Sequence, residues 1–212
     1  LTARVTEPSP PATGDPETAA RLYLEDHRDR LGIASTTFFS LPLERRYESE
    51  TAGLTHLVFR QRHAGIVVFG GEVLAHVGRD GRVLEAQTGA PWPSGAQPNL
   101  SVGLTAAEAV VAAAQVLAAA PTDLRVVSSE LGPERETVLA STQFREPVPA
   151  RLVWFASATD VRLAWELSLH LDSSHWYSAV VDANTGELLF SHNLYRDDQP
   201  RGSVFRAAGV PH

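Results

Sequence analysis

Apolar and polar residues alternate over residues 55–89, and this stretch is the clearest structural signal in the chain. Residues 57–61 and 72–77 both repeat with a period of two, which is typical of strands that bury at least one face. Asp80-Gly81 then favours a tight hairpin, because this pair tolerates the positive φ that such a turn needs. An extended, largely apolar run resumes immediately afterwards. The pattern predicts an antiparallel meander.

The chain before the meander predicts an arm, a helix and an edge strand. Residues 1–15 are rich in proline and poor in apolar side chains, so we expect a mobile arm. Asp15 is placed to cap a helix with Pro16 in its first turn, where a missing N–H costs nothing. Gly32 is the expected carboxyl-terminal stop of that helix. Residues 38–47 are partly apolar and predict an edge strand.

A second helix is indicated by the pair Thr105 and Glu108, which form a capping box. Residues 109–120 are strong helix formers, and Pro121 is expected to end the helix. Because the segment after Glu108 carries no charge, we expect it to lie largely buried against a sheet.

Strand patterns return in the last third of the chain. Residues 152–155 form a short apolar run, and residues 163–171 alternate between apolar and polar side chains. Residues 176–181 and 187–192 predict a hairpin joined by the turn residues of 182–186. The helix–strands order therefore occurs twice, which indicates an α+β fold of two helix-on-antiparallel-sheet modules in tandem.

Residues 90–98 concentrate proline and glycine and mark the expected boundary between the modules. The charged, proline-containing segments 145–151 and 196–201 predict exposed loops, or alternatively segments that a protease must reach. The expected organisation is an arm over 1–15, a first module over 16–92, a linker over 93–103, a second module over 104–195 and a tail over 196–212.

Composition narrows the possible functions. The chain has 212 residues with 43% hydrophobic and 20% charged content, which is ordinary for a globular protein. A net charge of −7 argues against a nucleic-acid partner, which would require a basic surface. Without cysteine there are no disulfides or thiolate metal sites, and no apolar run is long enough for a membrane span. Because methionine does not occur, even at position 1, we expect a processed or trimmed piece of a longer precursor.

The histidines do not form a zinc-peptidase motif. No His-Glu-x-x-His occurs among the eight histidines. His56 and His63 fall on opposite faces of a strand, which argues against a shared metal. His170 and His175 flank a turn that contains Asp172 and Ser173. Such a local group is poorly placed to align a catalytic triad, so we interpret these residues as solvated turn residues.

Two other patterns have a structural and a functional interpretation. Asp182-x-Asn184-x-Gly186 is similar to a calcium loop, but position twelve is Asn193 rather than an acid, which favours a hairpin turn. The tryptophans could line a ligand groove, although packing against a helix is the more common use of alternating aromatics. They are Trp154, Trp165 and Trp176. No catalytic set follows from the sequence.

The meander carries a resemblance to a known family. Its motif positions resemble the FTP (fungalysin/thermolysin propeptide) module, in which Gly-Ile-Pro-Val is common and Val67 here replaces the proline. The matching positions are His56, Gln61, Gly65, Gly70, Gly71, Asp80 and Gly81.

The second half resembles the PepSY module. The matching residues are the Thr105-x-x-Glu108 helix start, Trp165 with Glu166, and the hairpin that contains Gly186. The order FTP then PepSY is similar to the amino-terminal propeptides of thermolysin-like and fungalysin-like zinc metallopeptidases. Residues 152–155 and the ending 193–195 are closer to the fungalysin side.

This resemblance implies two cystatin-like modules and a propeptide function. It implies a secreted precursor in which the chain templates folding of a metallopeptidase catalytic domain in cis and inhibits it until cleavage. The chain would hold no cofactor, since zinc would belong to that catalytic domain. The implied inhibitory and cleavage segment consists of Asn193, Leu194, Tyr195, Arg196, Arg201, Gly202 and Ser203.

Two alternatives stay open. The chain could act in trans as a free-standing inhibitor of a separate protease. It could also bind a small ligand between helix and sheet, although the dense leucine and tryptophan alternation argues against an unfilled pocket there.

Overall fold

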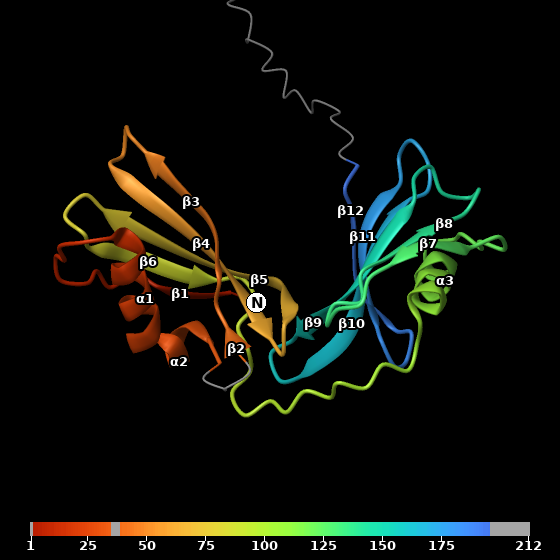
Figure 1. Cartoon of the computed structure of the whole chain (residues 1–212), viewed down its shortest axis with the longest axis horizontal. Coiled ribbons are helices and arrows are strands. Elements are labelled where there is room, and N and C mark those ends of the chain that lie inside the picture. The colour runs from red at the N-terminus through yellow and green to blue at the C-terminus, as the bar shows by residue number, and fades with distance from the viewer. Residues whose placement is uncertain (1, 35–38, 196–212) are drawn as a thin grey trace, which may run out of the picture.

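The computed structural model describes residues 2–34 and 39–195. The fold is α+β, mostly strands with three helices, and its strands form one curled mixed sheet (Figure 1). The helices are α1 (Pro16–Asp26), α2 (Arg28–Leu31) and α3 (Ala106–Val116). The strands of the first half are β1 (Ala3–Val5), β2 (Phe39–Ser40), β3 (Leu43–Ser49), β4 (Leu54–His63), β5 (Ile66–Gly78) and β6 (Val83–Thr88). Those of the second half are β7 (Arg125–Ser129), β8 (Thr137–Ala140), β9 (Val148–Ala156), β10 (Val161–His170), β11 (Trp176–Asp182) and β12 (Leu188–Asn193).

The meander predicted from the alternating pattern is confirmed. Strands β4, β5 and β6 pair antiparallel in chain order, and the turn between β5 and β6 contains Gly81 with φ of +74°. Helix α1 begins as expected, because the Asp15 carboxylate accepts hydrogen bonds from the backbone N–H groups of Glu17 and Thr18. Helices α1 and α2 cover one face of the meander. The main buried side chains of this first core are Tyr23, Leu24, Leu31, Leu57, Phe59, Val73, Ala75, Val77, Val83 and Ala86.

The amino-terminal arm differs from the expectation. Ala3–Val5 form strand β1, which pairs antiparallel with β6, and only 1% of Val5 is exposed. Farther along, the backbone N–H groups of Ser9 and Ala12 donate to β6 and the preceding turn. The prediction of a mobile arm was therefore wrong for these residues. Without β1, the backbone groups of β6 would form an unpaired sheet edge, a cost that composition alone does not reveal.

Within this one sheet, β1 to β6 and β7 to β12 form two antiparallel parts, called the first and the second sheet below, and α3 packs on the second. The capping box at Thr105 is confirmed, but the helix ends at Val116 rather than Ala120. Ala118 adopts a left-handed conformation with φ of +62°, and the N–H of Ala119 bonds back to the carbonyl of Ala114. This turn directs the following residues toward the core.

In the second half, two further strands and the start of a third were not expected. The pattern showed no strand at β7 or β8, and residues 145–151 were predicted to be an exposed loop, whereas β9 begins at Val148. Val148 and Ala150 are buried. Pro149 is tolerated because it lies beyond the last β9–β10 pair, Ala150 with Leu167, so its missing N–H leaves that ladder intact.

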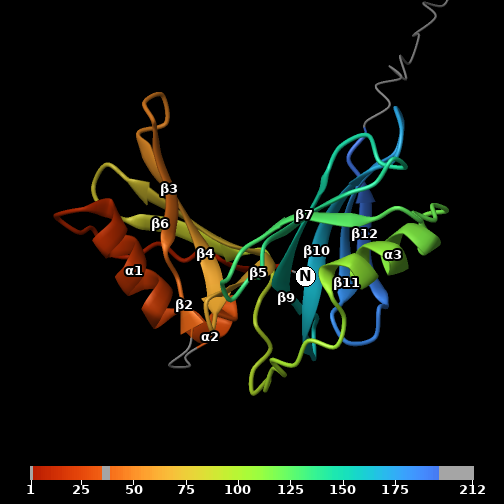
Figure 2. The ribbon, with the colours of Figure 1, turned by 45° about the vertical axis from the view of Figure 1, so that its right-hand side comes forward.

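The two halves are joined through β5, not only through the segment after β6. Val68 of β5 pairs in parallel with Trp154 of β9, so the expected tandem modules share one sheet. Figure 2 shows the helices on the two outer sides, with the helix-free faces of the sheet turned toward each other. The main buried side chains of the second core are Ile66, Val68, Trp92, Val110, Leu139, Leu152, Trp154, Leu163, Trp165, Leu167, Leu169 and Val181.

Glycines 70 and 71 let one strand serve both cores. Before them, Ile66 and Val68 of β5 pack into the second core, and after them Val73 begins the run that packs into the first. Gly70 has φ of +65°, and a Cβ on Gly71 would lie 2.6 Å from the Val68 side chain and 2.9 Å from its carbonyl oxygen. The strand therefore changes which face it buries at a position where only glycine fits without strain.

We expect Gly71→Ala to destabilise the chain by about 2 kcal/mol, because the new methyl group overlaps both side chain and backbone of Val68. Urea unfolding followed by circular dichroism measures this difference. Gly132→Ala is the matched control, since a Cβ there meets nothing within 4 Å. Equal midpoints for the two variants would contradict the role assigned to Gly71.

Candidate functional site

The joint between the halves is an aromatic cluster. The indole N–H of Trp154 donates to the backbone carbonyl of His63 at 2.9 Å. Trp92 stacks on the His63 ring with centroids 5.0 Å apart and meets Trp154 edge-on at 6.0 Å. Burial lowers the pKa of His63, which favours its neutral form. Trp92, which follows β6 in the proline-rich segment, thus anchors that segment to both halves.

A buried carboxylate ties the same joint together. Glu134 lies in the β7–β8 loop and is 9% exposed. Its Oε1 accepts from Arg62 Nη1 at 2.7 Å and from the backbone N–H of Val67 at 3.1 Å. Its backbone carbonyl accepts from the N–H of Leu152 at 2.6 Å. One residue therefore connects β4, β5 and β9.

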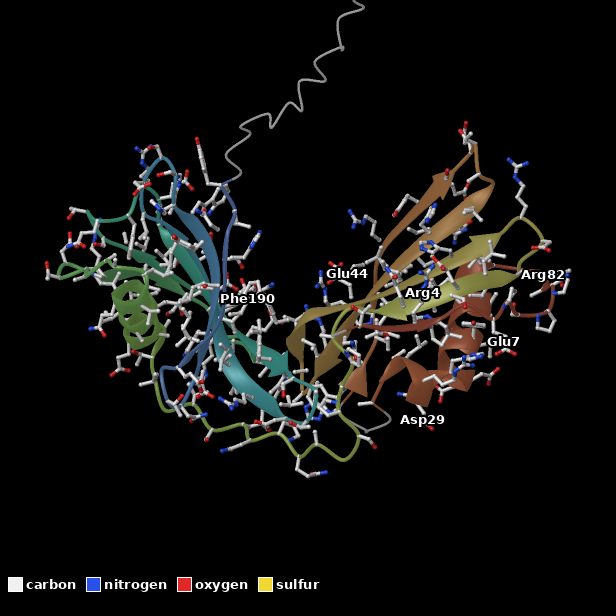
Figure 3. All side chains as sticks on the ribbon, turned by 180° about the vertical axis from the view of Figure 1, so that it is seen from behind. Arg4, Glu7, Asp29, Glu44, Arg82 and Phe190 are labelled. Carbon is white, nitrogen blue, oxygen red and sulfur yellow. The ribbon has the colours of Figure 1, made fainter. Side chains whose placement is uncertain are left out.

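The helix-free face near the joint is apolar. Val67, Val153, Ala164 and Val180 form a small buried cluster on this face. Around it, Phe69 contacts Phe155 and Phe190 with ring centroids 6.2 and 5.2 Å apart. Figure 3 shows Phe190 on the side of its strand that faces the first half. This face offers an apolar surface without a covering helix.

A groove of about 410 Å³ lies on the helix-free side of the second sheet. Arg151 Nε donates to Glu166 Oε2 at 2.7 Å within it. Burial opposes the charge of Arg151, but the hydrogen bond and charge of Glu166 outweigh this effect and raise the pKa of the guanidinium. The residues that line the groove are Glu136, Thr137, Val138, Pro149, Ala150, Arg151, Glu166, Leu167, Ser168, Ser178 and Leu194.

The described chain ends beside this groove. Asn193 holds the ending in place, because its side chain donates to the Ser174 carbonyl and accepts from the backbone N–H groups of Trp176 and Tyr195. Leu194 lines the groove, and Leu194 and Tyr195 are exposed. The other residues of the expected inhibitory segment lie outside the described residues: Arg196, Arg201, Gly202 and Ser203.

The FTP-like positions of the first half have structural partners. The Gln61 side chain is fully buried, and its amide donates to the carbonyl of Ala90 at 3.0 Å. Gly65 has φ of +78° in the β4–β5 turn, and Asp80 accepts from the N–H of Arg82 in the β5–β6 turn. A Cβ on Gly81 would overlap the Ala12 carbonyl of the docked arm. His56 pairs with another histidine, described below.

The PepSY-like positions also have partners. Trp165 is buried, and its indole N–H donates to the carbonyl of Leu104 at 3.0 Å, which ties the start of α3 to β10. Gly186 has φ of +76° in the β11–β12 hairpin. Glu166 is the partner of Arg151 in the groove.

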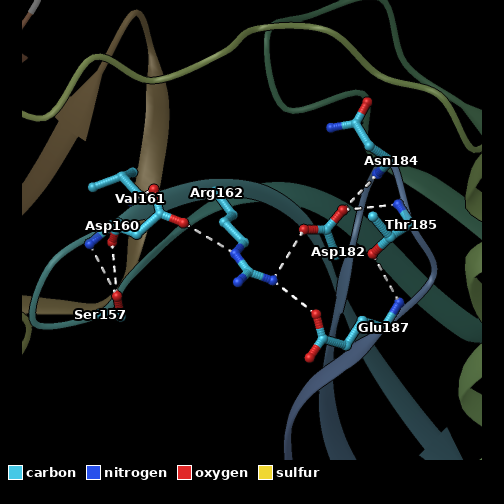
Figure 4. Close-up of polar contacts among 8 residues, drawn as sticks. All are labelled: Ser157, Asp160, Val161, Arg162, Asp182, Asn184, Thr185 and Glu187. Carbon is cyan, nitrogen blue, oxygen red and sulfur yellow. Dashed lines mark hydrogen bonds and ion pairs between the residues drawn. The ribbon is translucent and has the colours of Figure 1, made fainter.

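The segment 182–186 is a hairpin turn, as the sequence favoured. Asp182 Oδ1 accepts from the N–H groups of Asn184 and Thr185 at 2.8 and 2.9 Å (Figure 4). Its carboxylate also lies 3.7 Å from Arg162, which bonds Glu187 at 2.8 Å. The hydrogen bonds that Arg162 donates to Asp160 and then to Glu187 raise the pKa of its guanidinium. The Asp182 carboxylate thus accepts backbone hydrogen bonds of the turn, and the Glu187 carboxylate binds Arg162.

The turn histidines do not form a relay. Asp172 and the Ser174 hydroxyl both contact the same nitrogen, Nδ1 of His175, at 2.9 and 3.2 Å. A triad requires the acid and the hydroxyl on opposite ring nitrogens. The Ser174 N–H and then His175 lower the pKa of Asp172, which is typical of a capped turn. Among residues 2–34 and 39–195, no group of three or more potential ligands could hold a metal ion.

Trp176 differs from the other two tryptophans. The alternating pattern favoured a core position for all three, but Trp176 is 41% exposed. It stacks on His170 with centroids 5.4 Å apart and donates to the Ser168 hydroxyl at 2.9 Å. Successive residues of β11 alternate between the two faces of the sheet. Because Ala179 and Val181 pack into the core under α3, Trp176 lies on the opposite face.

Sequence reasoning missed Glu134, Trp92 and His76. A tryptophan among prolines is a weak signal of anchoring, but nothing local marks Glu134, since its partners are far away in the sequence.

None of the described helices has the length and apolar character needed to cross a membrane.

Residues 42–87 match the family model described as Fungalysin/Thermolysin Propeptide Motif. No curated protein sequence matches the chain. Among solved structures, the Bacillus megaterium YpeB C-terminal domain is similar at 12% identity, over 89% of this chain and 68% of that chain, with a TM-score of 0.35. That likeness is too distant to carry an argument. The chain thus contains an FTP propeptide motif, and no catalytic domain is identified in it.

Proposed function

We propose that this chain is the propeptide region of a secreted fungalysin-like zinc metallopeptidase. It would template folding of the catalytic domain in cis, inhibit that domain and be removed by proteolysis. The observation that carries the proposal is the FTP motif over residues 42–87, which includes the strand that joins both halves. Zinc would belong to the catalytic domain.

The proposed division follows the two cores. Residues 16–92 would be the FTP-like module and residues 104–195 a PepSY-like module, both of cystatin-like form, with 93–103 between them. The shared β5 and the Glu134 contacts support a rigid pair, which suits a folding template because a preorganised surface loses less entropy on binding.

The helix-free face is the surface we assign to the catalytic domain. Apolar side chains remain partly exposed there, and the chain leaves the second sheet beside the groove at Leu194. A domain that follows in cis would meet this face at high effective concentration. An extended segment after Tyr195 would inhibit by lying in the substrate cleft as a substrate does.

The gene beyond His212 tests the proposal first. A His-Glu-x-x-His motif within a few hundred residues in the same reading frame supports the cis-acting propeptide. A stop codon near His212 would instead favour the alternative, an inhibitor that acts in trans on a separate protease.

A refolding assay tests the assigned surface. The denatured catalytic domain encoded downstream is diluted into buffer with and without this chain, and recovered peptidase activity is measured after the chain is digested. We expect the wild-type chain to raise the recovered peptidase activity at least tenfold. The Leu194→Asp variant should raise it less. Leu131→Asp is the matched control, because Leu131 is fully exposed at the tip of the β7–β8 loop. An equal loss in both variants would overturn the surface assignment.

The small-ligand alternative has a specific observation to test, namely the groove of about 410 Å³. It lies on the helix-free face, not between helix and sheet.

A further inference from the structure

Two histidines face each other across the first sheet. His56 of β4 and His76 of β5 are directly paired in the antiparallel ladder, and their Nδ1 atoms are 2.7 Å apart. The rings meet edge-on with centroids 4.7 Å apart. Both side chains lie on the helix-free face of the first sheet, since their neighbours Leu57 and Ala75 point into the core.

These histidines belong to a row that crosses four strands. Tyr47 of the edge strand β3 pairs with His56 and stacks on its ring at 4.7 Å. On the other side, Glu85 of β6 pairs with His76, and its Oε1 lies 3.6 Å from Nε2 of that ring. Arg4 of β1 in turn bonds Glu85.

The other charged side chains described near the row also have partners. Arg45 of β3 lies over the Tyr47 ring at 5.8 Å. Farther along the same strands, Arg60 of β4 bonds Glu72 of β5 and Glu44 of β3. Among the residues that the structure describes, the carboxylate in contact with the histidine pair is Glu85, which Arg4 partly neutralises.

The Nδ1–Nδ1 contact limits how many protons the pair can hold. A hydrogen bond between two imidazole nitrogens needs one N–H donor and one bare acceptor. One added proton is compatible with this bond, because the charged ring still donates. A second proton places two N–H donors and two positive charges against each other at 2.7 Å.

We propose that the His56–His76 pair makes the attachment of edge strand β3 to the first sheet sensitive to acid. When the pair takes its second proton, the hydrogen bond breaks and the His56 ring loses the position on which Tyr47 stacks. Strand β3 has no other described neighbour than β4, so this contact contributes directly to its attachment.

The direction of the effect follows from linkage. Burial first, and then the charge of His56, lower the pKa of His76 in the folded chain. The folded state therefore binds fewer protons than the unfolded state below the ordinary histidine pKa of about 6.5. The contribution to stability is complete above that pH and is lost as pH falls toward the folded pKa.

Hydrogen exchange at the β3–β4 amides tests the proposal. After correction for the intrinsic exchange rate, we expect protection of these amides in the wild-type chain to fall on the order of tenfold between pH 7.0 and 5.0. His56→Gln should remove most of this dependence, because glutamine can still hydrogen-bond His76 but does not titrate. His192→Gln is the control, because His192 is an exposed residue of β12 in the second half. This variant should keep the pH dependence of the wild-type chain.

A second measurement needs no variant. In an NMR titration of the imidazole protons, His76 should titrate below the ordinary histidine pKa of about 6.5, because burial and then the charge of His56 oppose its protonation. Equal protection at pH 7.0 and 5.0, or a His76 pKa at or above about 6.5, would overturn the proposal. Neither experiment uses a peptidase, so its outcome is independent of the proposed function.

Discussion

Trp154→Ala is expected to destabilise the chain by about 4 kcal/mol, among the largest effects of any single substitution in it. The side chain is fully buried in the second core, and its N–H bonds the His63 carbonyl of the first half. Truncation removes this bond and leaves a cavity against Trp92. Urea unfolding monitored by circular dichroism gives the free energy of unfolding.

Trp176→Ala is the matched control for this prediction. It removes the same side chain from a position that is 41% exposed, so we expect a loss of about 1 kcal/mol or less. Similar losses for both variants would mean that burial at the joint does not account for the effect of Trp154.

Glu134→Ala is expected to cost about 2–3 kcal/mol. The substitution leaves the Val67 N–H and the Arg62 guanidinium without their shared acceptor. About a third of the Arg62 side chain is exposed, so water can solvate the guanidinium once the carboxylate is removed. The expected loss of stability is therefore at the lower end of the range for a broken buried ion pair. The same unfolding assay measures it.

Glu134→Gln separates the hydrogen bond from the charge. Its amide oxygen can still accept from Val67, so we expect roughly half of the alanine effect, with weaker dependence on salt. Glu130→Ala, an exposed residue of the same loop, should change stability by less than about 0.5 kcal/mol. A loss at Glu130 equal to that at Glu134 would place the effect in the loop and not in the carboxylate.

Several elements could be predicted because their signals are local. The alternation around Phe59 and Ala75 determines which face of the meander is buried, since a strand shows each face every second residue. The caps at Asp15 and Thr105 involve backbone groups only two or three residues away. Likewise, Gly81 and the 182–186 turn depend on short-range backbone geometry.

Other elements could not be predicted because their partners are distant in the sequence. Strand β1 is ordered by β6, about eighty residues later, although its composition is that of an arm. Strand β7 has no buried residue, so no alternation marks it, and it exists because β8 pairs with it. Val148 was predicted to lie in a loop because segment 145–151 contains prolines. Its pairing with Leu139 of β8 places it in a strand instead.

The sequence by itself determined the α+β class, the meander, the two capped helices and the FTP motif, because periodicity, capping and turn chemistry act over a few residues. Only the tertiary structure decided how the halves join. Gly70 and Gly71 let β5 enter two cores, Glu134 bridges three strands, and His56 meets His76. Such contacts depend on the three-dimensional approach of separate segments, which no local pattern records.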